Sequence, residues 1–380
     1  MLLWTIIIFL LILSVLVISH EFGHFLVAKY FGVRVDEFGL GFPPTIKRLF
    51  TWRGTDFVLN LLPIGGYVNL AGENASPDEE ERPDNDDPTL FCRQAAWKRF
   101  LVILAGPLVN IILAMFIFMI VYGVAGIPKE FADKVFIEGV QEKSSAEQAG
   151  LPVGAQVLFV QATDSAQIAI TKNEQLMGFV ADHVGQNIIL TVQPDCEQGI
   201  CHGEIATYEA YLRCSEERLF GEAALGVSLT QYQDMHYPLY KQIPLGIYHG
   251  VKRSFSMAWE MLENLGLYFR QLFHREPKTI DMMGPVGIVS SLNRYQTFSV
   301  GFLAILSFAG VLSLNLGIIN LLPIPAVDGG RLVLIVAEKF VGRRTIAKIE
   351  AGLNYAGLVL ILLLSLLITL KDVWRIFKGE

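Results

Sequence analysis

The chain begins with a stretch, Leu2 to Ser19, that has no charged residue at all. A helix of about 20 apolar residues crosses the hydrocarbon of a bilayer, so this absence predicts a membrane span. The stretch also lacks the basic start and the small-residue cleavage site of a secretory signal. We therefore expect it to be retained as a transmembrane helix.

Cysteine and clustered positive charge are scarce too. The four cysteines form no CxxC pair, which excludes the common cysteine zinc sites. No stripe of lysine and arginine is present and the net charge is -7, so we expect no nucleic-acid partner. Cys196, Cys201 and Cys214 could form one disulfide if their part of the chain faces an oxidising compartment, but the sequence does not select the pair.

Apolar residues are in excess, at 52% of the chain with a mean hydropathy of +0.45, and they occur in blocks. The blocks predict a polytopic α-helical membrane protein with four transmembrane helices, at residues 2–28, 100–124, 300–322 and 356–370. Residues 247–273 mix apolar and charged side chains, which favours an amphipathic helix lying on the membrane surface. Contact with the lipid bilayer is therefore expected along much of the chain.

Ionisable residues stand at the end of the first span. His20 and His24 are four residues apart, so a helix presents both imidazoles on one face, and Glu21 lies beside the first. This is the HExxH pattern, in which two histidines bind Zn2+ and the glutamate acts as general base. Two core histidines with ordinary partners are the alternative, but ionisable residues inside membrane helices are usually functional.

Asp328 is the expected third metal ligand, because a catalytic zinc takes three protein ligands. It follows the third span and a break at Pro323 and Pro325 that exposes backbone inside the membrane. If residues 247–273 lie on the surface, the first and third spans run in the same direction, and His20, His24 and Asp328 share one leaflet. A helix N-cap is the alternative role for Asp328.

Three other segments carry weaker signals. Residues 57–62 and 67–70 predict two short strands around a turn at Pro63 to Gly66, either re-entering the membrane or forming a plain juxtamembrane hairpin. Asn315 and Asn320 either bond a neighbouring helix or contact an extended substrate. Residues 76–88 carry seven carboxylates and predict a solvated loop, with a cation site as the alternative.

The only stretch long enough for a soluble domain is residues 130–233. Its short β-rich segments, at 134–140, 156–160, 187–192 and 225–229, are punctuated by glycine. Residues 145–151 resemble the short helix and turn of PDZ domains, and Leu225, Gly226 and Val227 resemble their carboxylate-binding loop. We expect one PDZ-like α+β domain, with a different small β-domain as the alternative.

Positive charge orients the chain. The loop between the first two spans carries nine Lys/Arg, and residues 331–350 carry five more, so both are expected on the cytoplasmic side. The expected parts are then an N-terminal membrane part (1–125), an extracytoplasmic PDZ-like domain (126–245), an amphipathic segment (246–299) and a C-terminal membrane part (300–380). The metal site lies toward the cytoplasmic leaflet.

Together these residues resemble the site-2 protease family of intramembrane zinc metalloproteases. The resemblance rests on six motifs taken in order: 20–24 (HEFGH), 39–42 (GLGF), 63–68 (PIGGYV), Gly106-Pro107 with Asn110, 284–288 (GPVGI) and 315–330 ending in Asp-Gly-Gly. It implies zinc held by His20, His24 and Asp328 with Glu21 as base. It also implies that Gly65, Gly66 and Tyr67 belong to a membrane-reentrant β-loop that pairs with substrate, while Asn315 and Asn320 help to hold that strand.

The function expected from this resemblance is hydrolysis of peptide bonds within the transmembrane segments of single-span proteins. Anti-sigma factors and remnant signal peptides are the implied substrates, peptide tails the implied ligands of the PDZ-like domain, and the bacterial inner membrane the implied location. A membrane zinc transporter or sensor is one alternative. A non-catalytic scaffold that binds peptide tails is the other.

Overall fold

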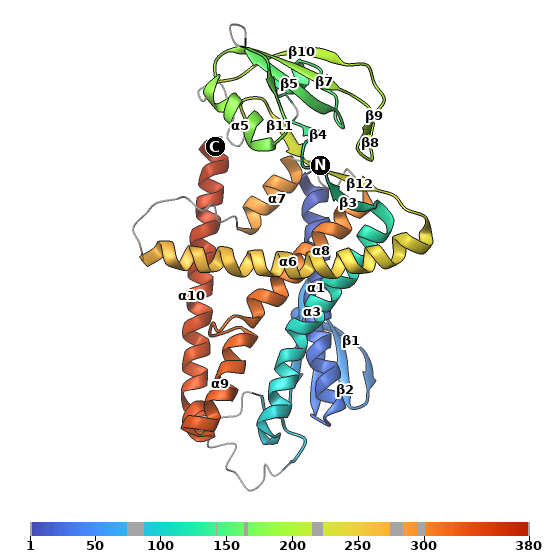
Figure 1. The fold of residues 1–380 in the computed structure, drawn as a ribbon. Helices are drawn as coiled ribbons and strands as arrows, with labels where there is room; N and C mark the ends of the chain where they lie inside the picture. The colour runs from blue at the N-terminus through green and yellow to red at the C-terminus, as the bar shows by residue number, and fades with distance from the viewer. Residues whose placement is uncertain are drawn as a thin grey trace. The chain divides into compact units, whose positions relative to one another are not determined.

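The structure, a computed structural model, describes residues 2–73, 87–141, 143–162, 166–214, 223–273, 284–294 and 301–378 (Figure 1). Its contacts divide the chain into two compact units. The first comprises Met1–Ile120 and Gly250–Asp372, and the second comprises Val121–His249 and Val373–Glu380. Most of the acidic segment 76–88 lies outside the described residues, so the solvated loop expected there stays a prediction.

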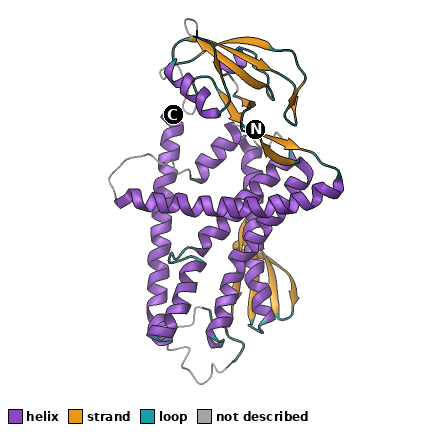
Figure 2. Ribbon diagram, viewed as in Figure 1, coloured by secondary structure: helices purple, strands orange, loops and turns teal. Residues whose placement is uncertain are grey.

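Long apolar helices form the first unit (Figure 2). They are α1 (Leu2–Tyr30), α3 (Ala96–Ala125), α8 (Phe302–Leu321) and α10 (Arg343–Lys378). The shorter helix α9 (Asp328–Val341) lies between α8 and α10 in the sequence. Within the described residues, four helices, α1, α3, α8 and α10, are long and apolar enough to cross a membrane, which confirms the prediction of four spans. The last is longer than expected, because polar turns extend the helix at both ends of the apolar block.

The surface of α10 explains why this unit needs lipid. The leucines of its central turns are exposed, among them Leu360, Leu362, Leu363, Leu366 and Leu367. A contiguous exposed apolar face of this kind is rare on a soluble monomer. Lipid hydrocarbon is the solvent that such a face requires.

A long amphipathic helix, α6 (Leu239–Phe273), precedes a short one, α7 (Pro285–Arg294). α6 begins eight residues before the predicted start at Ile247 and continues through Pro244. It is not among the four helices that could span, as expected. α6 crosses α3 closely at Gly250, where a Cβ atom would lie 2.5 Å from the backbone nitrogen of Met119.

The β-structure of the first unit pairs β1 (Val35–Trp52) with β2 (Thr55–Leu70). Each residue from Glu37 to Leu40 pairs with one residue in 56–59 and with one in 66–69. Along β1 the partner's residue number rises in the first stretch and falls in the second. The chain therefore reverses between these stretches, where the turn at residues 63–66 was predicted. The prediction of a simple two-stranded hairpin was incomplete, because β1 lies between the two expected strands and was missed.

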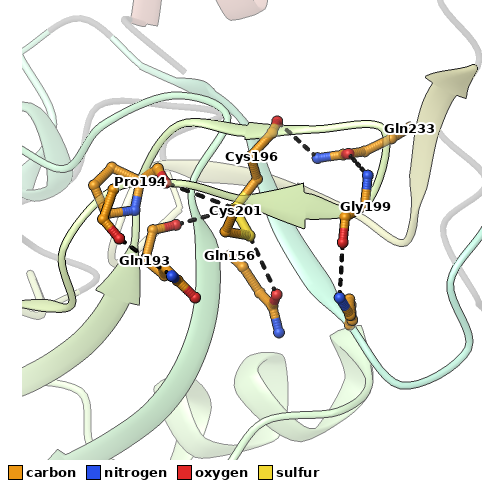
Figure 3. The surroundings of a disulfide bond; sticks show 9 residues. Gln156, Gln193, Pro194, Cys196, Gly199, Cys201 and Gln233 are labelled. Carbon is orange, nitrogen blue, oxygen red and sulfur yellow. Dashed lines mark hydrogen bonds between the residues drawn. A yellow bond between two sulfur atoms is a disulfide. The ribbon is translucent and has the colours of Figure 1, made fainter. Parts of the chain in front are cut away.

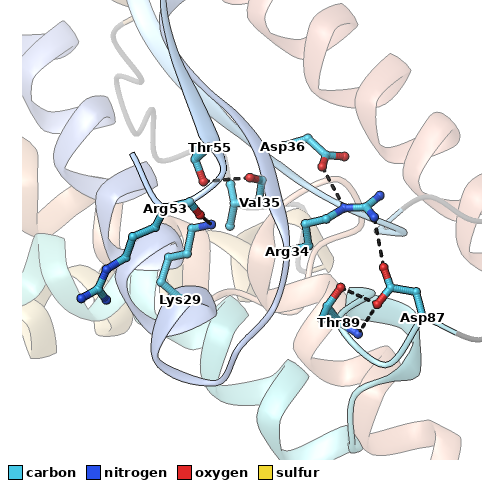
Figure 4. A network of polar contacts seen from close by, with 8 residues as sticks. All are labelled: Lys29, Arg34, Val35, Asp36, Arg53, Thr55, Asp87 and Thr89. Carbon is cyan, nitrogen blue, oxygen red and sulfur yellow. Dashed lines mark hydrogen bonds and ion pairs between the residues drawn. The ribbon is translucent and has the colours of Figure 1, made fainter. Parts of the chain in front are cut away.

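Polar contacts tie the start of β1 to its surroundings (Figure 4). The Arg34 side chain donates to Asp36 and Asp87, at 3.0 Å each, and Thr55 donates to the backbone oxygen of Val35 at 2.8 Å. Two hydrogen bonds from Thr89, followed by Arg34, lower the pKa of the exposed Asp87 carboxyl. The segment that leads into α3 is thus fastened beside the end of α1.

The second unit is built on one six-stranded sheet. Its strands follow the order β10 (Ala206–Tyr211), β7 (Asn187–Gln193), β5 (Gln156–Ala162), β4 (Val135–Val140) and β11 (Val227–Thr230), with β6 (Ile168–Ala169) beside β5. Two short helices accompany it, α4 (Ser145–Gln148) and α5 (Asn173–Asp182). A second small pair joins β3 (Ile127–Glu130) to β12 (Tyr232–Met235). The four strands predicted from sequence are present, and β11 is an edge strand of the sheet.

One disulfide joins Cys196 and Cys201 (Figure 3). It closes the hairpin of β8 (Cys196–Glu197) and β9 (Ile200–Cys201), and Cys214 does not take part. Gln233 holds the same hairpin, because its side chain accepts from the Gly199 N–H and donates to the Cys196 carbonyl. The structure therefore selects one pair among the three cysteines.

Reduction of this disulfide should lower the stability of the second unit by about 2 kcal/mol, the chain-entropy value for so short a loop. Thermal unfolding of the purified full-length protein, with and without reductant, measures the change. The Cys196→Ser, Cys201→Ser double variant is the control and should not respond to reductant. An unmoved transition in the wild type would show that the hairpin contributes nothing beyond its hydrogen bonds.

Candidate metal centre

The two histidines of α1 face one another inside the first unit. His20 Nε2 and His24 Nε2 are 3.2 Å apart, and both residues are buried. The i, i+4 spacing on a helix produces this arrangement, as the sequence indicated. The His24 ring is fixed by its other nitrogen, because Nδ1 donates to the backbone oxygen of Val102 at 2.8 Å. A carbonyl can only accept, so in the neutral imidazole the proton is on Nδ1 and Nε2 carries a lone pair.

Asp328 reaches the same point from a distant part of the chain. Its Oδ2 lies 2.9 Å from His20 Nε2 and 3.4 Å from His24 Nε2. The chain turns back sharply between α8 and α9, and Gly329 and Gly330 allow this, since a Cβ at either position would overlap backbone of residues 321–324. The N-cap of α9 is Val327, so the alternative role of Asp328 as an N-cap is wrong.

Two ion pairs, one buried and one partly buried, hold α9 in place. Arg99 of α3 donates to both carboxylate oxygens of Glu338, at 2.8 and 2.5 Å. Arg331, one turn after Asp328, pairs with Glu73 just beyond β2. Breaking a buried pair leaves an uncompensated charge and costs about 3–5 kcal/mol, so α9 has little freedom to move. The carboxylate of Asp328 is thereby fixed relative to α3 and the sheet.

The donor set fits a zinc ion. His20, His24 and Asp328 each offer one ligand atom, and these atoms lie within 4.8 Å of one another. Ligands of a tetrahedral zinc stand about 3.3–3.5 Å apart, close to the separations observed. Among the described residues, the buried Oδ2 of Asp328 has no hydrogen bond of acceptable geometry. With the proton of each imidazole on Nδ1, three lone-pair atoms would face one another, and a cation would satisfy them.

The helix α3 supplies features that sequence reasoning did not assign. Val102, Gly106 and Asn110 are four residues apart on one face of α3, opposite the two histidines. A Cβ atom at Gly106 would lie 2.6 Å from His24 Cε1 and 2.9 Å from His20 Cε1. Only glycine therefore leaves room for both imidazoles. The sequence signal was the glycine and asparagine at helical spacing in an otherwise apolar span.

Glu21 lies beside this cluster, and its carboxyl group is close enough to interact electrostatically with His24, His20 and Asp328. Gly65 and Gly66, which are expected in the loop that pairs with the substrate, lie close to Glu21. A Cβ atom at Gly66 would lie 4.0 Å from Glu21 Cγ and 3.4 Å from Ile18 Cγ1. The turn between the halves of β2 is therefore packed against α1 next to the glutamate.

The first unit also contains the other residues that were expected to contact the substrate, Tyr67, Asn315 and Asn320. Tyr67 covers Gly39 with its ring and donates through its hydroxyl to Glu37, so its side chain is already engaged. Asn315 and Asn320 are half-buried on α8. Within the described residues neither amide has a hydrogen-bond partner, so the alternative in which they bond a neighbouring helix is not observed. Their polar groups are available for another ligand.

Leu225, Gly226 and Val227 belong to the second unit. The backbone oxygens of Leu225 and Gly226 accept hydrogen bonds from Ala146 and Gln141, at 2.9 Å each. In the described part of the chain, the N–H groups of Leu225 and Gly226 have no acceptor. This loop directly precedes the edge strand β11.

Comparisons with known proteins cover nearly the whole chain. The sequence model of peptidase family M50 matches residues 8–364. A candidate zinc metalloprotease of Rickettsia conorii is 28% identical, over 97% of this chain and 98% of the relative. Zinc metalloprotease RasP of Oceanobacillus iheyensis is 26% identical, over 98% and 99%. A candidate chloroplast membrane metalloprotease of Arabidopsis thaliana is 28% identical, over 95% and 78%.

Proposed function

The chain belongs to peptidase family M50, the site-2 protease family of zinc metalloproteases, and we propose that it cleaves peptide bonds within the transmembrane segments of single-span membrane proteins. It is a multi-pass membrane protein, and the expected resemblance to this family is confirmed. The observation that carries the proposal is the convergence of His20, His24 and Asp328 beside Glu21 on helices apolar enough to span.

We assign the zinc ligands to His20 Nε2, His24 Nε2 and Asp328 Oδ2. A zinc ion held there would polarise the scissile carbonyl and lower the pKa of a water molecule to about 7. The proposed role of Glu21 is to accept the proton of the attacking water and to pass it to the leaving amine. Because the histidines are buried, the local dielectric is low, which would strengthen the electrostatic interactions among the zinc ion, its ligands and Glu21.

The substrate has to be extended before it can react, because a helix hides its carbonyls in internal hydrogen bonds. We propose that the cleaved segment adds as a strand beside the turn at Gly65, Gly66 and Tyr67, in a loop that re-enters the membrane. Backbone pairing of this kind gives affinity without demanding a particular sequence. The amides of Asn315 and Asn320, which have no hydrogen-bond partner among the described residues, would hold the same strand.

The second unit is proposed to be a PDZ-like domain that binds a peptide tail at Leu225, Gly226 and Val227. Backbone N–H groups that have no acceptor within the described ranges, placed just before an edge strand, suit a terminal carboxylate. Substrates trimmed on the outside by another protease, such as anti-sigma factors and remnant signal peptides, would then be admitted. The family resemblance implies a bacterial inner membrane, and the positive loops favour an orientation with the metal toward the cytoplasmic leaflet and this domain outside.

The two alternatives receive less support. A transporter needs metal-binding groups along a path through the membrane, whereas His20, His24 and Asp328 form the only such group of three among the described residues. A non-catalytic scaffold does not require a glutamate beside the donor cluster. Both alternatives predict a purified protein that leaves a membrane substrate intact.

Removal of metal should abolish cleavage of a single-span reporter protein by the purified enzyme, and added zinc should restore it. Both results are expected because cleavage needs a zinc ion held by the three proposed ligands. Cleavage is measured by gel mobility of the reporter in detergent or vesicles. A reporter with glycine or proline near the cleaved bond should react faster than one with leucine there. Cleavage that persists unchanged in the presence of a strong chelator would reject the metalloprotease assignment.

A further inference from the structure

The polar side chain of Asn110 is buried at the metal site, although the mechanism above does not use it. Asn110 has no exposed surface, and its carboxamide nitrogen Nδ2 lies 3.4 Å from His20 Nδ1. Its backbone oxygen is occupied separately, by the Ser313 hydroxyl at 2.7 Å. The side-chain oxygen Oδ1 has no hydrogen-bond donor among the described residues. A buried polar group in this condition calls for an explanation.

The chemistry of the metal ligands supplies one. A histidine that binds metal through Nε2 carries its proton on Nδ1, and Nδ1 then needs an acceptor. His24 has this acceptor in the Val102 carbonyl. His20 faces Asn110 instead, and the only acceptor that this side chain offers is Oδ1. The two ends of a carboxamide are nearly equal in size, so the amide can turn to place Oδ1 toward the ring.

The opposite arrangement works against the site. If Nδ1 of His20 accepted a hydrogen bond from the amide nitrogen, its proton would be on Nε2. That proton would point at His24 Nε2 and Asp328 Oδ2, which lie 3.2 and 2.9 Å away. The lone pair needed for a metal would be lost. The hydrogen bond that Asn110 makes therefore decides whether His20 can serve as a ligand.

We propose that Asn110 is a positioning residue of the metal site, whose side-chain carbonyl accepts the Nδ1 hydrogen of His20 and holds the Nε2 lone pair toward Asp328. This inference rests on the proposed metal ligands. The face of α3 then provides one acceptor for each imidazole, a backbone carbonyl at Val102 and a side-chain carbonyl at Asn110, with Gly106 between them. The two acceptors are eight residues apart on α3, and Gly106 lies midway between them.

The test compares zinc affinity of purified full-length variants by competition with a chromophoric chelator. Asn110→Leu keeps the size of the side chain but has no acceptor, and should bind zinc about 10- to 100-fold more weakly, the usual effect of losing such a partner. Asn110→Asp keeps an acceptor and should stay within a few-fold of the wild type. If Asn110→Leu does not fold, Asn110→Ala also lacks the acceptor and replaces it.

Ser313→Ala is the matched control, because it removes the neighbouring contact of α8 to the Asn110 backbone while leaving the carboxamide intact. It should lower thermal stability and leave zinc affinity unchanged. Wild-type affinity in a folded Asn110→Leu protein, or equal losses in Asn110→Leu and Asn110→Asp, would overturn the role of Asn110 alone. A wild type that binds no zinc would overturn the proposed ligands, and this role with them.

Discussion

Replacing Glu21 by glutamine is expected to lower the rate of cleavage by about 10²- to 10⁴-fold, the usual contribution of a general acid–base group. Glutamine has the same shape but cannot take up a proton at neutral pH. The change leaves His20, His24 and Asp328 in place, so zinc content should remain that of the wild type. Single-turnover cleavage of the reporter protein and metal analysis of the same sample measure the two quantities.

The control for charge removal is Glu263→Gln, an exposed position on α6 remote in sequence from the site. It should cleave at the wild-type rate. Glu21→Gln that retains full activity would eliminate this glutamate as the base. Loss of zinc together with activity in Glu21→Gln would point to a structural role, and the proposed assignment of the base would again fail.

Replacing Gly106 by alanine should weaken zinc binding and abolish cleavage. The added methyl group would overlap the His24 ring at the atom that faces the metal site. The two helices pack closely at this point, since a Cβ at Gly23 of α1 would lie 2.6 Å from the Ala105 carbonyl of α3. Overpacking of this kind costs about 1–3 kcal/mol, which corresponds to a loss of about 5- to 150-fold in affinity.

Gly123→Ala provides the comparison on the same helix, because a Cβ at Gly123 meets no atom within 4 Å. Alanine favours a helix more than glycine does, so this variant should be at least as stable as the wild type and fully active. Zinc affinity is measured for both variants by chelator competition. Equal zinc affinity in Gly106→Ala and the wild type would mean that the imidazoles are not confined by α3.

Local patterns predicted the four spans and the three side chains that the structure brings together as a candidate metal site. Uninterrupted apolar runs allow few structures other than a membrane helix, and the spacing of His20 and His24 fixes their common face. Asp328 could be predicted as the third candidate ligand because Pro323 and Pro325 before it indicate a break after the third span. These signals lie within one helix or at its end, where sequence spacing translates directly into position.

What the sequence missed depends on non-local contacts. β1 contains the pair Pro43-Pro44 and several charges, which argue against a strand when they are considered alone, and its place between the two halves of β2 is a matter of register. The Val102 carbonyl could not be recognised, since every residue has one. The same holds for the disulfide, where three cysteines at short spacing gave no reason to choose Cys196 and Cys201.

The attachment of both ligand-bearing segments to α3 has a consequence for the biosynthesis of the enzyme. The imidazoles and their acceptor at Val102 are complete once the second helix has left the ribosome, but Asp328 is added about 200 residues later. At about 5–20 residues per second, translation takes roughly 10–40 s to bridge this gap. On the proposed ligand set, the nascent protease therefore enters the bilayer with an incomplete metal site, which Asp328 would complete once Glu338 pairs with Arg99.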